Sequence, residues 1–325
     1  MMQRCNTMKK LKILFTILIT VTLFSGLAYR SISKNAQTGE TRFLFDTVCS
    51  ITVFSPSAEA EISAAFDAAS EIHRLTDFFD QASDVARINS AKANTPVSVS
   101  RETAEIIHLA QKIQADSKGA FDISLAPVSQ LWDFKSENPA VPRKSEVEKA
   151  LDICKNSKIT VDMTKLTAFK NRDDAQIDLG GIAKGYAADT AAKVLEEMGV
   201  NAAILDFGGN IVVVGKNPKT SDGEWRIGLQ TPFAPTGEYS KIIEIQSGST
   251  VTSGTYQRYF ESDGSMYHHI IDPQNGFPAQ REYKSVSISA QSSALADALA
   301  TAVFVLGKED GAGLAEKWGA TVEFL

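Results

Sequence analysis

The sequence has little cysteine, with three residues in 325. Cys5 lies in the N-terminal segment, which leaves Cys49 and Cys154, and no Cys-x-x-Cys pair or Cys/His cluster is present. This argues against a disulfide-stapled framework and against a zinc site of ordinary ligand spacing. A Cys49–Cys154 disulfide is conceivable in an oxidising compartment, but we expect two separate thiols.

The chain also lacks an excess of positive charge. Its formal net charge is −6 and its pI is near 5.4. Because phosphate contacts require a basic face, general nucleic-acid binding is not expected. Internal repeats and low-complexity segments are absent, and 43% hydrophobic residues are ample for a large core.

A long hydrophobic run occurs at the N-terminus, from Ile13 to about Ala28, after the basic residues Arg4, Lys9, Lys10 and Lys12. This pattern predicts a signal peptide or membrane anchor in residues 1–30, since the run is shorter than the ~20 residues of an ordinary spanning helix. The polar residues 31–41 predict a tether, followed by a folded domain at 42–325. We expect an exported protein at the outer face of the cytoplasmic membrane or in the periplasm, anchored or released.

The remaining sequence alternates helical and strand patterns. Residues 43–54 predict a strand, 131–143 a loop, and 158–178 short strands that include AQIDL. Helices are predicted at 58–79, 101–117, 182–198, 292–306 and 309–318, and most other strands have hairpin spacing. This favours an α+β fold with mixed, largely antiparallel sheets and packed helices over a doubly wound parallel sheet.

A carboxylate interrupts the apolar helix SALADALATAVFVLG, residues 293–307. Asp297 and Thr301 are four residues apart and therefore share one helix face. An unpartnered buried carboxylate is costly. The two side chains are either turned toward solvent or a backbone N–H, or they are hard oxygen ligands suited to Mg²⁺.

The segment IDLGGIAKGYAADTA, 177–191, predicts a strand end, a glycine turn and a helix start. Backbone N–H groups at such a helix N-terminus suit a phosphate, and Lys184 lies in the first turn. The glycines could instead serve close packing, because the pattern is neither a Walker loop nor GxGxxG.

Two adjacent histidines occur in YHHIIDPQNGFPA, 267–279. Their position beside Asp272 makes proton transfer by one of them plausible. The nearby VTSGTYQRYF, 251–260, offers Ser253 only as a weak nucleophile candidate, because no GxSxG elbow exists.

Together with GAFDISLAPVSQLWDF (119–134) and LDFGGNIVVVG, these segments resemble the ApbE family, the FAD:protein FMN transferases, in order and spacing. The resemblance extends from about residue 43 to 325 and implies the family's T-fold-like architecture. It implies that Mg²⁺, or alternatively Mn²⁺, is held by the residues Asp297, Thr301, the Gly181 carbonyl and the Ala300 carbonyl. Such a cation would offset the buried carboxylate.

The resemblance also implies residues that contact FAD, which are Asp178, Lys184, Ala120, Phe121, Asp122, Ile271 and Phe45. Phe45 departs from the family, because relatives often have Met before Gly-Thr and this chain reads FDT. His269 is the candidate catalytic base beside Asp297, with Asp178 or the metal-bound environment as alternatives.

The implied reaction is metal-dependent transfer of FMN from FAD to a Thr or Ser hydroxyl of an acceptor flavoprotein, with release of AMP. The acceptor would carry a D-x-x-[ST]-x-[ST]-like motif, as in a membrane electron-transfer subunit. Two alternatives stay open: a metal-dependent FAD pyrophosphatase that yields FMN and AMP, and an exported FAD-binding protein without turnover.

Overall fold

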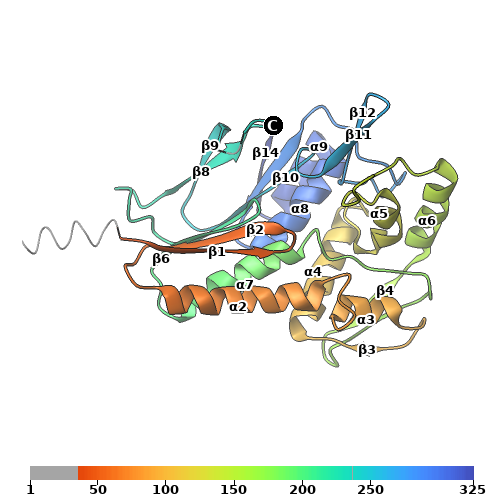
Figure 1. Cartoon of the computed structure of the whole chain (residues 1–325), viewed down its shortest axis with the longest axis horizontal. Coiled ribbons are helices and arrows are strands. Elements are labelled where there is room, and N and C mark those ends of the chain that lie inside the picture. The colour runs from red at the N-terminus through yellow and green to blue at the C-terminus, as the bar shows by residue number, and fades with distance from the viewer. Residues whose placement is uncertain (1–35, 236) are drawn as a thin grey trace, which may run out of the picture.

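The computed structural model describes residues 36–235 and 237–325 (Figure 1). The predicted signal or anchor and most of the predicted tether lie outside these residues. Residues 38–41, assigned to the tether, instead begin strand β1. Within the described ranges, no helix has the length and apolar character needed to cross a membrane.

The centre of the fold is a seven-stranded sheet in which every neighbouring pair is antiparallel. The predicted α+β class is therefore confirmed. The strand order along the sheet is β1 (Thr38–Leu44), β2 (Thr47–Val53), β6 (Ala202–Phe207), β7 (Asn210–Gly215), β10 (Gly248–Gly254), β13 (Ser285–Ala290) and β14 (Thr321–Phe324).

Helices cover one face of this sheet (Figure 1). The longest is α2, in which Ile62, Phe66 and Ala69 recur at helical spacing and are buried in the main core. The layer consists of α2 (Glu59–Thr76), α7 (Ala183–Glu197), α8 (Ser293–Leu306) and α9 (Lys308–Lys317). The helix α8 packs on β10 and β13, and it is apolar almost all round because α7, α9 and the sheet surround it.

A two-stranded ribbon covers part of the opposite sheet face. It is formed by β8 (Trp225–Gln230) and β9 (Tyr239–Ile245). Trp225 and Ile227 from β8 form a small core with Val213 of β7, separate from the core under the helices. The hairpin of β11 (Tyr259–Ser262) and β12 (Ser265–His268) projects near one end of the sheet (Figure 1).

The residues between α2 and α7 form a cap at one end of the molecule (Figure 1). Its helices surround an aromatic cluster centred on Trp132, whose Nε1 donates to the Gly276 carbonyl oxygen at 2.9 Å. The cap elements are α3 (Asp84–Ser90), α4 (Arg101–Asp116), η1 (Ile123–Leu125), α5 (Ala126–Trp132), α6 (Lys144–Asn156) and the sheet β3-β5-β4 (Val97–Ser98, Thr167–Lys170, Ile159–Asp162).

Some sequence predictions are wrong in detail. Residues 43–54 are not one strand: Phe45 and Asp46 both have positive φ (52° and 56°) and turn the chain into the β1–β2 hairpin. Two-residue hairpin loops favour this geometry, but the usual Asn-Gly pair is absent here. The AQIDL segment is not a strand, and α3, α5 and α6 were missed.

The two cysteines of the folded part are separate thiols, as expected. Both are buried, and burial raises the pKa of each thiol to about 11. They are therefore protonated and unreactive at neutral pH.

The closest approach between α7 and α8 is at Gly185. A Cβ atom at this position would lie 2.2 Å from the carbonyl oxygen of Ser293 and 2.7 Å from the amide nitrogen of Ala294. Only glycine permits this backbone contact, which fixes the separation of the two helices.

We expect Gly185→Ala to lower the free energy of unfolding by at least about 3 kcal/mol, because the added methyl group meets backbone that cannot rotate away. Urea denaturation measures the change. The matched control is Gly313→Ala in α9, where a Cβ meets nothing within 4 Å. This control should gain roughly 0.5–1 kcal/mol from helix propensity. Equal stability of the two variants would show that α7 and α8 separate freely.

Candidate functional site

Asp297 is buried where α8 crosses the start of α7, with 3% of its surface exposed. Its Oδ2 accepts a hydrogen bond from the Gly185 amide at 3.0 Å. The Lys184 ammonium lies 3.4 Å from Oδ1 and 3.5 Å from Oδ2. An amide in the first turn of a helix has no intrahelical partner, so the carboxylate takes that role here. The predicted alternative in which Asp297 meets a backbone N–H is therefore confirmed, and Lys184 is a second partner that was not predicted.

Asp189, which the sequence analysis missed, fixes the beginning of α8. Its carboxylate accepts from the Ser292 hydroxyl at 2.7 Å, the Ser293 amide at 2.7 Å and the Ala294 amide at 3.0 Å. Burial raises the pKa of Asp189. The sequence did contain an indication of this role, because Asp189 follows Gly185 by four residues and therefore lies on the same face of α7. One face of α7 thus both contacts α8 and caps it.

The glycine turn before α7 meets the GAFD segment. The Asp178 Oδ1 accepts from the Gly180 amide at 2.7 Å, and the Asp178 amide donates to the Ile123 carbonyl at 2.8 Å. A Cβ on Gly181 would lie 3.1 Å from the Phe121 ring and 3.9 Å from the Thr301 hydroxyl oxygen. Segments near residues 121, 181 and 301 therefore converge on one place.

This convergence supplies the chemistry that a hard divalent cation requires. One carboxylate (Asp297), one hydroxyl (Thr301) and the carbonyl of the glycine turn (Gly181) are all oxygen donors. In the described part of the chain, no three His, Cys, Asp or Glu side chains gather as a metal cluster. The residues present fit a cation that shares its coordination with substrate oxygens. Ala300 lies inside α8, where its carbonyl also belongs to the helix.

The side chains of the GAFD segment are buried or hydrogen-bonded within the protein. Asp122 accepts from the Ser124 amide at 2.8 Å and the Ser124 hydroxyl at 2.6 Å, and burial raises its pKa. Ala120 and Phe121 are buried. A ligand at this segment would therefore meet mainly backbone groups, and the predicted FAD contacts of these three residues stay predictions.

The two adjacent histidines differ in role. His268 is buried, its Nδ1 accepts from the Ile270 amide at 3.3 Å, and its Nε2 therefore donates to the Ala279 carbonyl at 3.1 Å. Both ring nitrogens are used, which makes His268 structural. Burial lowers its pKa to about 4.

His269 is held at one ring nitrogen only. Its Nδ1 lies 3.2 Å from the Arg258 carbonyl oxygen, which can only accept, so Nδ1 carries the proton and the lone pair is on Nε2. Burial, followed by the nearby Arg258 charge, lowers the pKa of His269 to about 3. The ring is therefore neutral at pH 7 and can accept a proton at Nε2.

Known proteins with similar sequences are FAD:protein FMN transferases. The sequence model of the ApbE family matches residues 45–325. The chain belongs to the ApbE family. It is 35% identical over 229 residues to the FAD:protein FMN transferase of Klebsiella pneumoniae, covering 70% of each chain. It is 33% identical over 283 residues to that of Treponema pallidum, covering 82% of this chain and 78% of the relative.

Solved ApbE structures have the same fold. The ApbE protein of Thermotoga maritima superposes with a TM-score of 0.78 at 32% identity, covering 89% of this chain and 94% of that chain. The Pseudomonas stutzeri flavinyl transferase ApbE, in its apo form, gives 0.76 at 28% identity over 89% and 90%. Both the resemblance and the fold predicted from sequence are confirmed.

Two further residues of this ApbE protein that were predicted to contact FAD are packed against neighbouring side chains. The Ile271 side chain is buried in the aromatic cluster of the cap, so only its backbone could meet a ligand. Phe45, at the β1–β2 turn, packs edge-on against His73 with ring centroids 4.8 Å apart. Both assignments stay predictions.

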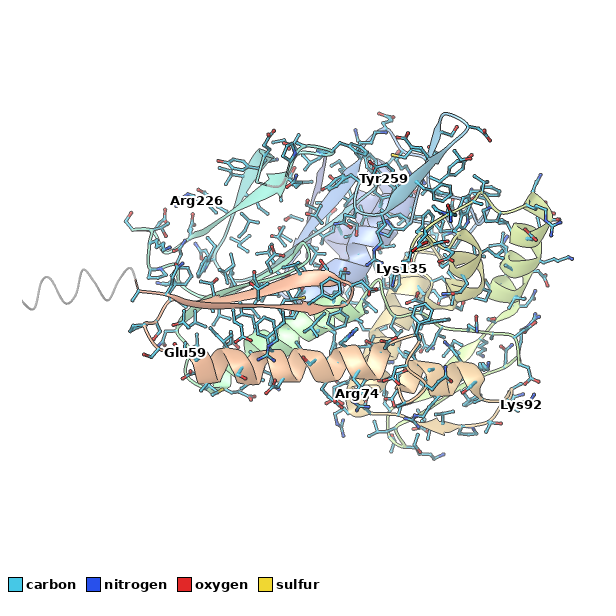
Figure 2. All side chains as sticks on the ribbon, in the orientation of Figure 1. Glu59, Arg74, Lys92, Lys135, Arg226 and Tyr259 are labelled. Carbon is cyan, nitrogen blue, oxygen red and sulfur yellow. The ribbon has the colours of Figure 1, made fainter. Side chains whose placement is uncertain are left out.

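The β1–β2 turn is tied to the cap and to the histidine segment. Asp46 forms an ion pair with Lys135, the residue labelled between this turn and α5 in Figure 2. An Arg258 guanidinium nitrogen lies 4.0 Å from the same carboxylate. These contacts lower the pKa of Asp46, chiefly through the Lys135 hydrogen bond. They connect the β1–β2 turn with the cap and with Arg258, whose carbonyl holds His269, and no spacing in the sequence indicates these contacts.

The buried neutral His268 predicts a pH-dependent stability. Its folded pKa (about 4) lies below the ordinary value of 6.5, so between these values the unfolded chain binds a proton that the folded chain does not. Stability is therefore complete above pH 6.5 and falls as the pH decreases, by about 1.4 kcal/mol per pH unit. His269, whose folded pKa is about 3, adds a similar slope. His268→Gln retains an Nε2 donor and should reduce the total slope between pH 6 and 5 by the part that His268 contributes, about 1.4 kcal/mol per pH unit. The test is urea unfolding of both proteins, in which the buried aspartates contribute equally. An identical slope in the variant would contradict the assignment.

Proposed function

We propose that this chain is an FAD:protein FMN transferase, moving FMN from FAD to a Thr or Ser hydroxyl of an acceptor flavoprotein and releasing AMP. The observation that carries the proposal is the convergence of Lys184, Asp297 and the glycine turn at the start of α7. A lysine, a helix N-terminus and hard oxygen donors suit a pyrophosphate with its cation. The names of the relatives agree with this chemistry.

In this proposal Mg²⁺, or Mn²⁺, is held by Asp297, Thr301 and the carbonyls of Gly181 and Ala300. When bound, the cation polarises the pyrophosphate and neutralises charge that develops on it. Lys184 binds the phosphate oxygens through its ammonium group, and Asp297 keeps Lys184 in place. Asp178 holds the glycine turn through the Gly180 amide, so that the donors at this turn are already oriented.

His269 acts at the acceptor side. Its Nε2 takes the proton of the acceptor hydroxyl while the hydroxyl oxygen bonds to the FMN phosphorus and the bond from that phosphorus to the AMP oxygen breaks. The Arg258 carbonyl holds the Nδ1 proton and so fixes the ring orientation. Asp178 is the alternative base. If water replaced the hydroxyl, the same steps would give a pyrophosphatase, and without turnover the site would only bind FAD.

The place of action belongs to the same proposal. Residues 1–30 would direct export and either anchor the protein to the membrane or be removed. Its acceptor would then be the exposed part of a membrane electron-transfer flavoprotein with a D-x-x-[ST]-x-[ST]-like motif.

The proposed activity is tested with Asp297→Asn. This variant retains an acceptor for the Gly185 amide but loses the charge that holds the cation and Lys184. We expect FMN transfer to fall at least about 100-fold. Intact mass of an acceptor fragment with the D-x-x-[ST]-x-[ST] motif, incubated with FAD and Mg²⁺, reports transfer, and AMP is measured in parallel. Asp310→Asn in α9 makes the same change at an exposed position and should retain full activity. AMP without a gain in acceptor mass in the wild type would favour the pyrophosphatase.

The base assignment predicts a separate loss in His269→Gln. Transfer should fall by about 10²–10⁴, because no group takes the hydroxyl proton, whereas the dissociation constant for FAD should change little. Flavin fluorescence measures binding, and His108→Gln in α4 serves as the control. Full transfer by His269→Gln would assign the base to another residue.

A further inference from the structure

A cleft lies on the sheet face opposite the helices, beneath the β8–β9 ribbon. Its volume is about 560 Å³. The floor comes from β6, β7 and β10 through Asp206, Ile211 and Thr252, and the roof from β8 through Ile227 and Leu229. This size suits a few residues of peptide or a small ligand.

One wall of the cleft adjoins the candidate base. Gln257 and Tyr259 line the cleft, and Arg258 between them provides the carbonyl that accepts from both the Nδ1 and the amide of His269. Tyr259 stands at the start of β11, directly opposite His268 in β12, and is labelled in Figure 2. His269 is therefore joined to this wall of the cleft through the Arg258 carbonyl.

The lining does not suit phosphate. No lysine, arginine or histidine is among its residues, and its one carboxyl group, Asp206, accepts from the Gly209 amide at 2.9 Å. Burial raises the pKa of Asp206. The other polar groups are the neutral side chains of Gln230, Gln257, Thr250, Thr252, Tyr256 and Tyr259. Because a pyrophosphate beside Asp206 would be repelled, the FAD phosphates belong with Lys184, and the cleft is left to an uncharged group.

The floor also allows close approach of a backbone. Gly209 lines it with φ of 92°, and a Cβ at this position would meet only Gln257 and Thr252, which also line the cleft, at 3.7 and 3.8 Å. Gly208 also lines the cleft, but a Cβ there would meet the Thr47 side chain at 2.5 Å. An extended peptide can approach such a surface more closely than it can approach ordinary residues.

The mouth of the cleft has a strained, exposed aromatic residue. Phe233 has φ of 61°, which is unfavourable for a bulky residue, and it is 49% exposed. Its ring lies edge-on to Tyr256 and Tyr259, with both centroids 5.8 Å away. Neither core packing nor backbone preference explains this arrangement, whereas an aromatic rim is common where a peptide binds.

We propose that this cleft binds the acceptor protein as an extended peptide segment, with the neutral residues around its Thr or Ser hydroxyl inside the cleft and the Asp of its motif outside, and presents that hydroxyl to the Nε2 of His269. The inference rests on the proposed transferase activity. It places the two substrates on different sides of His269, with the FAD phosphates at Lys184 and the acceptor under the β8–β9 ribbon.

The test is Phe233→Ala in the full chain, with the acceptor fragment used above as the probe. We expect the KM for the fragment to rise roughly tenfold, because an aromatic contact at the rim is lost. The dissociation constant for FAD should stay within about twofold. Ala234→Trp, which fills the mouth, should raise the same KM. Phe43→Ala removes an exposed aromatic side chain outside the cleft and should change neither constant.

The results that would overturn this inference differ from those that would overturn the proposed function. Weaker FAD binding with an unchanged KM for the fragment would show that the cleft holds part of FAD and would overturn the inference. Unchanged constants in both cleft variants would also overturn it, while leaving the transferase intact. A wild-type chain that neither transfers FMN nor releases AMP would overturn the proposed function, and this inference with it.

Discussion

The contact of α7 with α8 is the constraint on which the site depends. Gly185 allows the two backbones to touch, and the same turn then gives its amide to Asp297. A side chain at this position would push the helices apart and leave a buried carboxylate without its partners, which is costly. Asp189 completes the arrangement from the same helix by capping the start of α8. The close packing of the two helices and the stabilisation of the Asp297 carboxylate therefore both depend on Gly185.

The sheet separates two kinds of chemistry. On its helical side are Asp297, Lys184 and the N-terminus of α7, which suit a charged ligand. On its other side the ribbon covers apolar residues of β6 and β7 and leaves a cleft whose polar groups are neutral apart from Asp206. His269 follows the β11–β12 hairpin and is held by Arg258, next to two residues that line this cleft. An antiparallel sheet with one covered and one partly open face makes this division possible.

The sequence predicts the main helices well, but it predicts the contacts of the site and the cap only in part. Periodicity located α2, α7 and α8 within a few residues, because each buries a continuous apolar stripe. A backbone N–H was one of the two partners predicted for Asp297, and the Gly185 amide confirms it. The contact with Lys184 was not predicted, since Lys184 and Asp297 are 113 residues apart and nothing local indicates their contact. The hairpin at Phe45 was missed because a bulky residue such as Phe45 rarely adopts positive φ. The cap helix α4 was predicted, whereas α3 and α5 were missed because they have only seven residues each, and α6 was missed as well. Asp189 was missed because a cap donated by another helix has no local signature.

The C-terminal strand has a consequence for how the protein folds. Leu325 accepts hydrogen bonds from the amides of Lys284 and Ser285, and its own amide donates to Ser285, so the last residue is part of the sheet. The helix that bears Asp297 lies just before this strand. Since Asp297 follows Lys184 by 113 residues, the crossing of α7 and α8 cannot assemble until α8 has been synthesised. A chain that ends before α8 would contain Lys184 and the glycine turn but not their partner, so the site depends on a helix that is synthesised long after the glycine turn.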